Sequence, residues 1–214
     1  MKRTLLIWTL LSLPLPTLAG GTIHGTVTLE KMKPAPSRPG YVAPLTKNPV
    51  QKPEAGKAIV YLERDDEKYP PPRPGTQAVV RQEGYQFRPS MLAVQTGTHV
   101  VFPNMDDEFH NVHSYSKPNG FEVGQHRKEE VPRGQEFKKP GVVKIYCHIH
   151  AHMRCILLVL DTPWFVTTDS EGKYTLKDIP PGEYWLRVFQ PSEKLLQQRV
   201  TVTDGKTTTV NLSR

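Results

Sequence analysis

Short runs of apolar residues, separated by turn-forming residues, dominate this chain of 214 residues. β-Branched and aromatic residues fill the runs, and Gly, Pro, Asn and Asp bound them, which is the pattern of β-strands. No long stretch has the three- and four-residue apolar spacing of an amphipathic helix. We therefore predict an all-β protein, with strands that include residues 22–29, 58–62, 100–102, 155–160, 174–176, 184–189, 199–203 and 208–212.

Proline-rich stretches interrupt this pattern twice. Residues 31–53 are polar and rich in Pro, which predicts a loop or an extended connector. The stretch from Tyr69 to Gly75 contains four prolines, and Pro lacks the N–H group that a sheet interior needs. This second stretch predicts a boundary between two parts of the fold.

The first residues have the composition of an export signal. Lys2 and Arg3 precede an apolar run from Leu5 to Leu13, and Ala19 is a small residue suited to cleavage. We expect residues 1–19 to be removed and the product to be periplasmic or secreted, without stable membrane insertion. Retention of this segment as an anchor is the alternative. The net charge of +7 is dispersed along the chain, which argues against nucleic-acid binding.

Metal-ligand residues gather at two places. Cys147, His150 and Met153 lie within seven residues, and His110 lies on an earlier predicted strand. One thiolate, two imidazoles and one thioether suit copper, and a pair of histidines with one cysteine and a weak axial Met is the electron-transfer type of copper site. Zinc is the main rival, because Cys and His also bind it, but Met is a poor zinc ligand.

The Cys-x2-His-x2-Met loop and the upstream His110-Asn111 resemble the plastocyanin/azurin-type cupredoxins, and the short loop is most similar to that of amicyanin. The resemblance also covers the motifs Phe-x-Pro at 87–89, Val-x2-Gly at 94–97 and Pro-Gly at 140–141. It implies a Greek-key β-barrel that binds one copper ion, Cu(I) or Cu(II). It also implies a hydrogen-bonding role beside the ligands for Asn111 and a solvent-reaching edge for His150.

A second resemblance lies after residue 161. The pattern Thr-Asp-x2-Gly-x-Tyr-x-Leu-x2-Ile-Pro-x-Gly-x-Tyr at 168–184 resembles the carboxypeptidase-regulatory-like, or transthyretin-like, β-sandwich. Its first two strands appear at 25–27 and 58–62, before the copper region, which favours a cupredoxin inserted into the sandwich. We predict first sandwich strands at 20–64, a linker at 65–76, the copper domain at 77–161 and the remaining sandwich at 162–214. Alternatively, residues 20–64 are an N-terminal extension of the copper domain.

Several residues near the ligands have competing interpretations. Cys147 and Cys155 flank a tight loop and could form a disulfide, although Cys155 has the pattern of a small buried strand residue. Four further histidines could bind a second ion or be exposed polar residues: His113, His126, His148 and His152. The acidic residues 106–108 are expected to form a solvated turn.

No Ser/His/Asp set, phosphate-binding Gly loop or paired carboxylates stand out, so an enzyme is not predicted. The leading hypothesis is an exported type 1 copper protein that carries single electrons between redox proteins of unknown identity. The alternative is a copper module that stores or delivers the metal, or docks, without redox turnover. A third hypothesis, a copper enzyme, requires a coordination position open to substrate.

Overall fold

The computed structural model describes residues 20–29, 54, 56–128, 130–131, 133–191 and 195–213. Within these ranges the chain is built from strands, and the prediction of an all-β protein is confirmed. No helix in the described part is long and apolar enough to cross a membrane. The expected signal at 1–19 and the Pro-rich loop at 31–53 lie outside the described residues.

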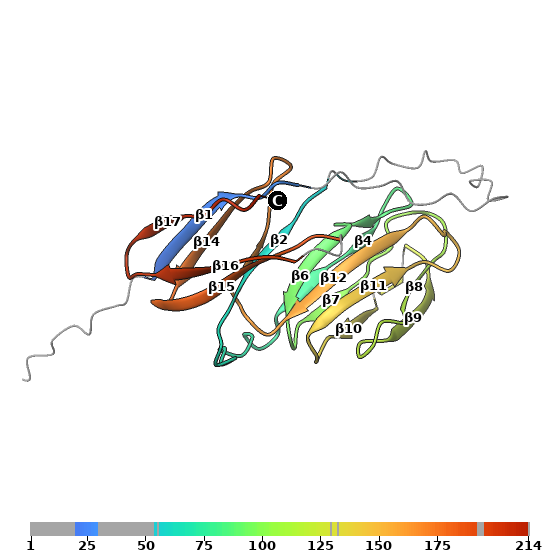
Figure 1. Ribbon diagram of the computed structural model, residues 1–214. Helices are drawn as coiled ribbons and strands as arrows, with labels where there is room; N and C mark the ends of the chain where they lie inside the picture. The colour runs from blue at the N-terminus through green and yellow to red at the C-terminus, as the bar shows by residue number, and fades with distance from the viewer. Residues whose placement is uncertain are drawn as a thin grey trace, which may run out of the picture.

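One half of the molecule is a sandwich of two sheets. The first sheet has the order β14-β1-β17, and the second has the order β13-β2-β15-β16 (Figure 1). Their bounds are β1 Gly21–Thr26, β2 Ile59–Glu63, β13 Phe165–Thr167, β14 Lys173–Ile179, β15 Gly182–Phe189, β16 Leu196–Val202 and β17 Thr207–Thr209.

The two early strands pair with strands from the end of the chain. β1 lies between β14 and β17, and β2 lies between β13 and β15. Their side chains share one core with the late strands, in which Ile23 and Leu62 pack with Leu186 and Val202. These strands therefore do not extend the copper region as a simple N-terminal addition. The domain boundaries themselves, and the description of this arrangement as an insertion, stay predictions.

The other half, from β3 to β12, is called the copper region and contains the candidate metal ligands. A five-stranded sheet, β6-β12-β11-β8-β9, faces a smaller sheet, β10-β7-β3, and the hairpin β4-β5. Their bounds are β3 Gln77–Val79, β4 Arg81–Gln82, β5 Phe87–Arg88, β6 Met91–Gln95, β7 His99–Val101, β8 His110–Ser114, β9 Phe121–His126, β10 Gly134–Glu136, β11 Gly141–Tyr146 and β12 Arg154–Leu160. No strand forms between residues 64 and 76, as the prolines there require.

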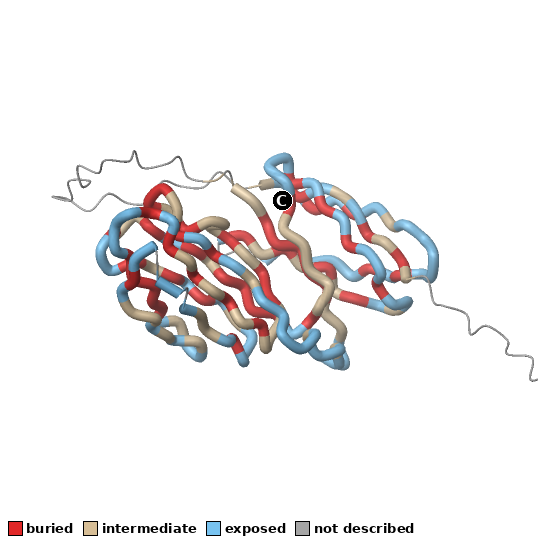
Figure 2. Tube along the Cα trace, turned by 180° about the vertical axis from the view of Figure 1, so that it is seen from behind, coloured by how far each residue is buried: buried red, intermediate tan, exposed pale blue. Residues whose placement is uncertain are grey.

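A third apolar cluster joins the two halves. On β12, Leu157 and Val159 face the copper-region core, while Leu158 and Leu160 face the sandwich. The alternation of side chains along a strand explains why this run is almost continuously apolar. β2 behaves in the same way, since Ile59 and Tyr61 contribute to the same third cluster. Figure 2 shows buried stretches along the strands of both halves.

Candidate metal centre

The candidate metal centre lies at the end of the copper region where three elements meet. His110 is the first residue of β8, and the segment 147–153 connects β11 to β12. Those two strands pair antiparallel up to Tyr146 and Arg154, and β8 pairs with β11 through His113 and Tyr146. This register brings two distant parts of the sequence to one end of the sheet.

Three ligand atoms converge there. His110 Nδ1 and His150 Nδ1 lie 3.0 Å apart, and Cys147 Sγ lies 4.0 Å from the first and 3.8 Å from the second. A point equidistant from the three lies about 2.1 Å from each, within the range of about 2.0–2.3 Å for bonds from a metal to imidazole nitrogen and thiolate sulfur. The donor set and its spacing therefore fit one metal ion.

Met153 lies at the end of the same segment. Its side chain is fully buried in the core that also contains Cys147, and its backbone N–H donates a hydrogen bond to the His150 carbonyl at 2.9 Å. This contact closes the segment into a tight turn, with the thioether on the core side.

The electrostatics of the site favour a thiolate. Burial raises the pKa of Cys147, but hydrogen bonds from His110 and His150, with backbone hydrogen bonds from Asn111 and His150, outweigh it and lower the pKa to about 5. Cys155 is different, since burial raises the pKa of its thiol. Both cysteines are free, so the disulfide does not form, and the Cys155 thiol instead donates to the Pro89 carbonyl at 3.4 Å.

Asp106 is a site residue that the sequence reasoning missed. We expected a solvated turn, but Asp106 is buried, and its Oδ2 lies 2.9 Å from His110 Nε2. Burial raises the pKa of Asp106, while hydrogen bonds from His110, Tyr85 and Gly84 lower it more, so the carboxylate stays ionised. Its two neighbours, at 107 and 108, are exposed as expected. An Asp four residues before a ligand His was the available signal.

Asn111 contributes in a different way from the one expected. Its backbone hydrogen-bonds Cys147, whereas its side chain donates to Glu122 at 3.1 Å and lies 3.1 Å from His113 Nδ1. The side chain therefore supports the neighbouring strands, and only the backbone supports the sulfur.

His150 does not reach solvent as predicted. The residue is only 4% exposed, because the Tyr85 ring lies edge-on against it with centroids 5.1 Å apart and His152 packs at 6.2 Å. Both covering side chains come from the copper region itself and not from the sandwich. The exposed neighbours in this segment are His148 and Ile149.

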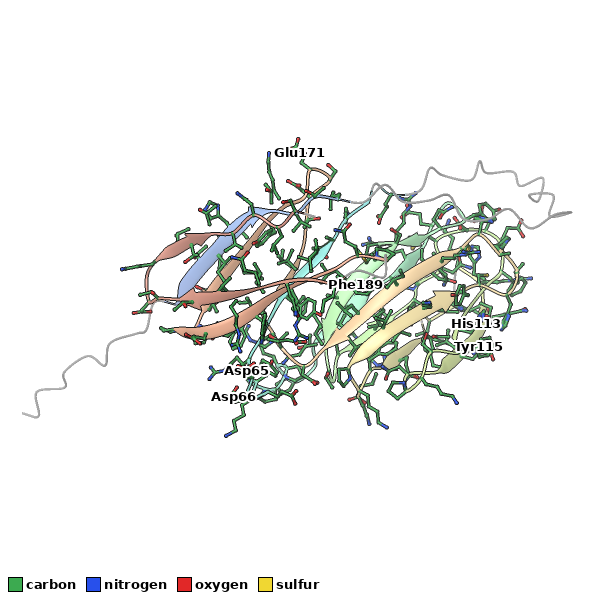
Figure 3. All side chains as sticks on the ribbon, viewed as in Figure 1. Asp65, Asp66, His113, Tyr115, Glu171 and Phe189 are labelled. Atoms are coloured by element: carbon green, nitrogen blue, oxygen red, sulfur yellow. The ribbon has the colours of Figure 1, made fainter. Side chains whose placement is uncertain are left out.

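The remaining histidines do not assemble a second cluster of three ligand atoms within the described residues. His113 and His148 stack with centroids 3.5 Å apart and planes 1° apart, so their lone pairs lie in parallel planes and do not converge on one ion. His126 is fully buried, with Nε2 2.9 Å from the Phe102 carbonyl. Figure 3 shows His113 at the side of the copper region away from the sandwich.

Comparison with known proteins gives one family match and several structural ones. Residues 157–213 match the model of the carboxypeptidase regulatory-like domain, which confirms that resemblance. No curated protein sequence matches the chain.

The similar solved structures include a nitrite reductase and two cupredoxins. A copper-containing nitrite reductase from Thermus scotoductus SA-01 has 28% identity and a TM-score of 0.37, covering 39% of this chain and 22% of the reductase. A Cu(I) amicyanin variant has 23% identity and a TM-score of 0.36, covering 39% and 81%. A purple cupredoxin from Nitrosopumilus maritimus has 22% identity and a TM-score of 0.34, covering 39% and 98%. The chain therefore spans about a fifth of the reductase.

Proposed function

We propose that this protein is an exported single-electron carrier that holds one copper ion through His110, Cys147, His150 and Met153. The observation that carries the proposal is the convergence of two imidazole Nδ1 atoms and one thiolate around a single point. A copper ion bound there would supply reversible one-electron chemistry. Export rests on the sequence of residues 1–19 and is part of the proposal.

The chemistry of the candidate ligand atoms supports copper over zinc. Two imidazoles and one thiolate suit either metal, but the fourth candidate ligand is the thioether of Met153, which zinc accepts poorly. The carboxylate nearest the ligands, Asp106, is bonded to the far nitrogen of His110 and is therefore engaged outside the triangle of ligand atoms.

The burial of the ligands supports a carrier over an enzyme. His110, Cys147 and His150 are 0%, 4% and 4% exposed, which leaves little room for a substrate to approach an ion at their centre. Asp106 and the backbone of Asn111 hold the ligand groups by hydrogen bonds. Because these hydrogen bonds already hold the ligand side chains in place, the side chains need little rearrangement when the charge on a bound ion changes.

Copper storage or delivery is the second candidate function. The exposed surface beside the pocket favours the electron carrier over this alternative. Ile149 is 41% exposed and lies between ligand residues Cys147 and His150, so a partner that covers it approaches the site closely. The carrier proposal therefore includes docking of a redox protein over this segment.

The test is a spectrum followed by redox cycling. The oxidised, copper-loaded protein should have an intense visible thiolate-to-copper band with narrow copper hyperfine splitting, and should keep its copper through repeated reduction and oxidation. Cys147→Ser should abolish the band, while the matched Cys155→Ser variant should retain it. Release of copper to a chelator of modest affinity on reduction would favour storage, and a colourless protein that takes up zinc in preference would defeat both.

A further inference from the structure

Tyr85 occupies an unusual position beside the ligands. It lies in the turn between β4 and β5, with a backbone φ of +57°, directly after Gly84 at +63°. A bulky residue in the left-handed region is disfavoured by its Cβ. Its side chain is nevertheless 1% exposed and belongs to the largest fully buried side chains of the described structure. Other contacts must hold this conformation.

Two of these contacts connect the turn to both ligand-bearing segments. The Asp106 carboxylate accepts hydrogen bonds from Gly84 N at 2.8 Å and Tyr85 N at 3.0 Å, while it also holds His110. On the other side, the His152 imidazole hydrogen-bonds the Tyr85 backbone. Burial lowers the pKa of His152, and this bond opposes that shift, so the Tyr85 carbonyl is its acceptor.

The ring of Tyr85 contacts both imidazoles of the proposed metal site. Its centroid lies 5.8 Å from that of His110, at an interplanar angle of 78°, and 5.1 Å from that of His150, at 76°. Both contacts have the edge-to-face geometry that stabilises aromatic pairs. One side chain therefore fixes the two imidazoles relative to each other and fills the space that solvent would otherwise occupy.

We propose that Tyr85 is a positioning residue that closes the metal pocket, orienting His110 and His150 and excluding solvent and competing ligands from Cys147. The proposal rests on metal binding at this site and deepens it, because a closed pocket retains its ion during redox cycling. Asp106 and His152 keep the ring in place through its backbone.

The first test uses the full-length, metal-free protein in a Cys155→Ser background and measures the rate of Cys147 alkylation by iodoacetamide as the pH is raised. The rates are compared on the high-pH plateau, where the sulfur is a thiolate in every variant, so the rate reports access. Tyr85→Gly removes the ring without opposing the left-handed backbone, and should alkylate about tenfold faster. Tyr85→Phe keeps the ring and should react at nearly the parent rate.

Phe137→Ala is the control, because Phe137 is as deeply buried as Tyr85 but lies in the segment following β10, where its ring packs edge-on against Phe121. It should leave the alkylation rate unchanged. Equal acceleration by Phe137→Ala, or no acceleration by Tyr85→Gly, would overturn the proposal.

The second measurement is copper retention. The copper-loaded Tyr85→Gly variant should lose Cu(I) to bathocuproine disulfonate about tenfold faster than the parent and the Phe variant. If the parent takes up no copper while Tyr85→Gly still exposes the thiolate, the proposed function fails and the closing role stands. If copper binds and is retained equally in all variants, the closing role fails and the proposed function stands.

Discussion

The Asp106 carboxylate and His110 form a buried pair, with Oδ2 2.9 Å from Nε2. An ionised carboxylate only accepts hydrogen bonds, so Nε2 carries a proton, and loss of the Nδ1 proton that is shared with Cys147 would leave the Nδ1 lone pair directed at the site. Burial lowers the pKa of His110, but the hydrogen bond to Asp106 and the contact with Cys147 raise it more. A carboxylate that fixes the tautomer of a ligand histidine usually strengthens metal binding.

Asp106→Asn should weaken copper binding by roughly 10–100-fold, the usual effect of removing such a partner of a ligand histidine. The amide keeps the shape of the side chain but loses the charge that favours Nε2–H. A competition titration against a chelator measures the change. Asp107→Asn is the control, since Asp107 is exposed and should leave the affinity within error. Equal affinities for the two variants would show that Asp106 has no effect on the metal.

The metal-free protein should show a Cys147 thiolate that is lost as the pH falls through about 5. Burial raises this pKa from its ordinary value of 9.0, and the hydrogen bonds from His110 and His150 lower it below that value. Between pH 9 and pH 5 the unfolded chain therefore binds a proton that the native state does not bind at Cys147.

The stabilisation from Cys147 is complete above pH 9, decreases as the pH falls and is absent below about 5. Ultraviolet absorbance of the thiolate gives the midpoint, and denaturant unfolding at several pH values gives the slope. Cys147→Ser should remove this contribution to the slope, whereas Cys155→Ser should not. A midpoint near the ordinary thiol value would contradict the prediction.

Leu62→Ala should destabilise the sandwich by about 2–5 kcal/mol, the usual cost of truncating a fully buried Leu, and leave the copper spectrum unchanged. Leu62 is 0% exposed in the sandwich core, whereas Leu157 is 0% exposed in the copper-region core. Leu157→Ala is therefore the reciprocal variant and should destabilise the copper region. Urea unfolding monitored by the copper band and by circular dichroism distinguishes them. Loss of the copper band in Leu62→Ala at low urea would show that the two halves unfold together.

Ile149→Glu should slow electron exchange with a protein partner and leave the copper spectrum nearly unchanged, because a charge at the rim of an interface mainly alters association. Ile149 is 41% exposed beside ligand residue His150. Val142→Glu is the matched control, since Val142 is 37% exposed near the other end of β11. Stopped-flow kinetics with a partner redox protein measure both. If the control slows exchange as much as Ile149→Glu, docking does not occur over the ligand segment.

The convergence of His110, Cys147 and His150 was predictable because two of them lie in one short motif and the strand pairing brings the third to them. The strands were predictable for a similar reason, since turn residues bound nearly every apolar run. Asp106 and Tyr85 were not predictable, because their roles depend on how two loops, distant in sequence, fold over the ligands. The exposure predicted for His150 was wrong for the same reason, since Tyr85 covers it from a turn whose path no local pattern specifies.

The apolar cluster between the halves fixes which end of β12 the sandwich contacts. Leu160, at one end of β12, packs toward the sandwich, while Arg154, at the other end, directly follows the ligand segment. Six residue steps along a strand span about 20 Å. The sandwich therefore leaves the ligand end uncovered, as the arrangement in Figure 1 also shows. A molecule that approaches the ligand end therefore does not have to displace the sandwich.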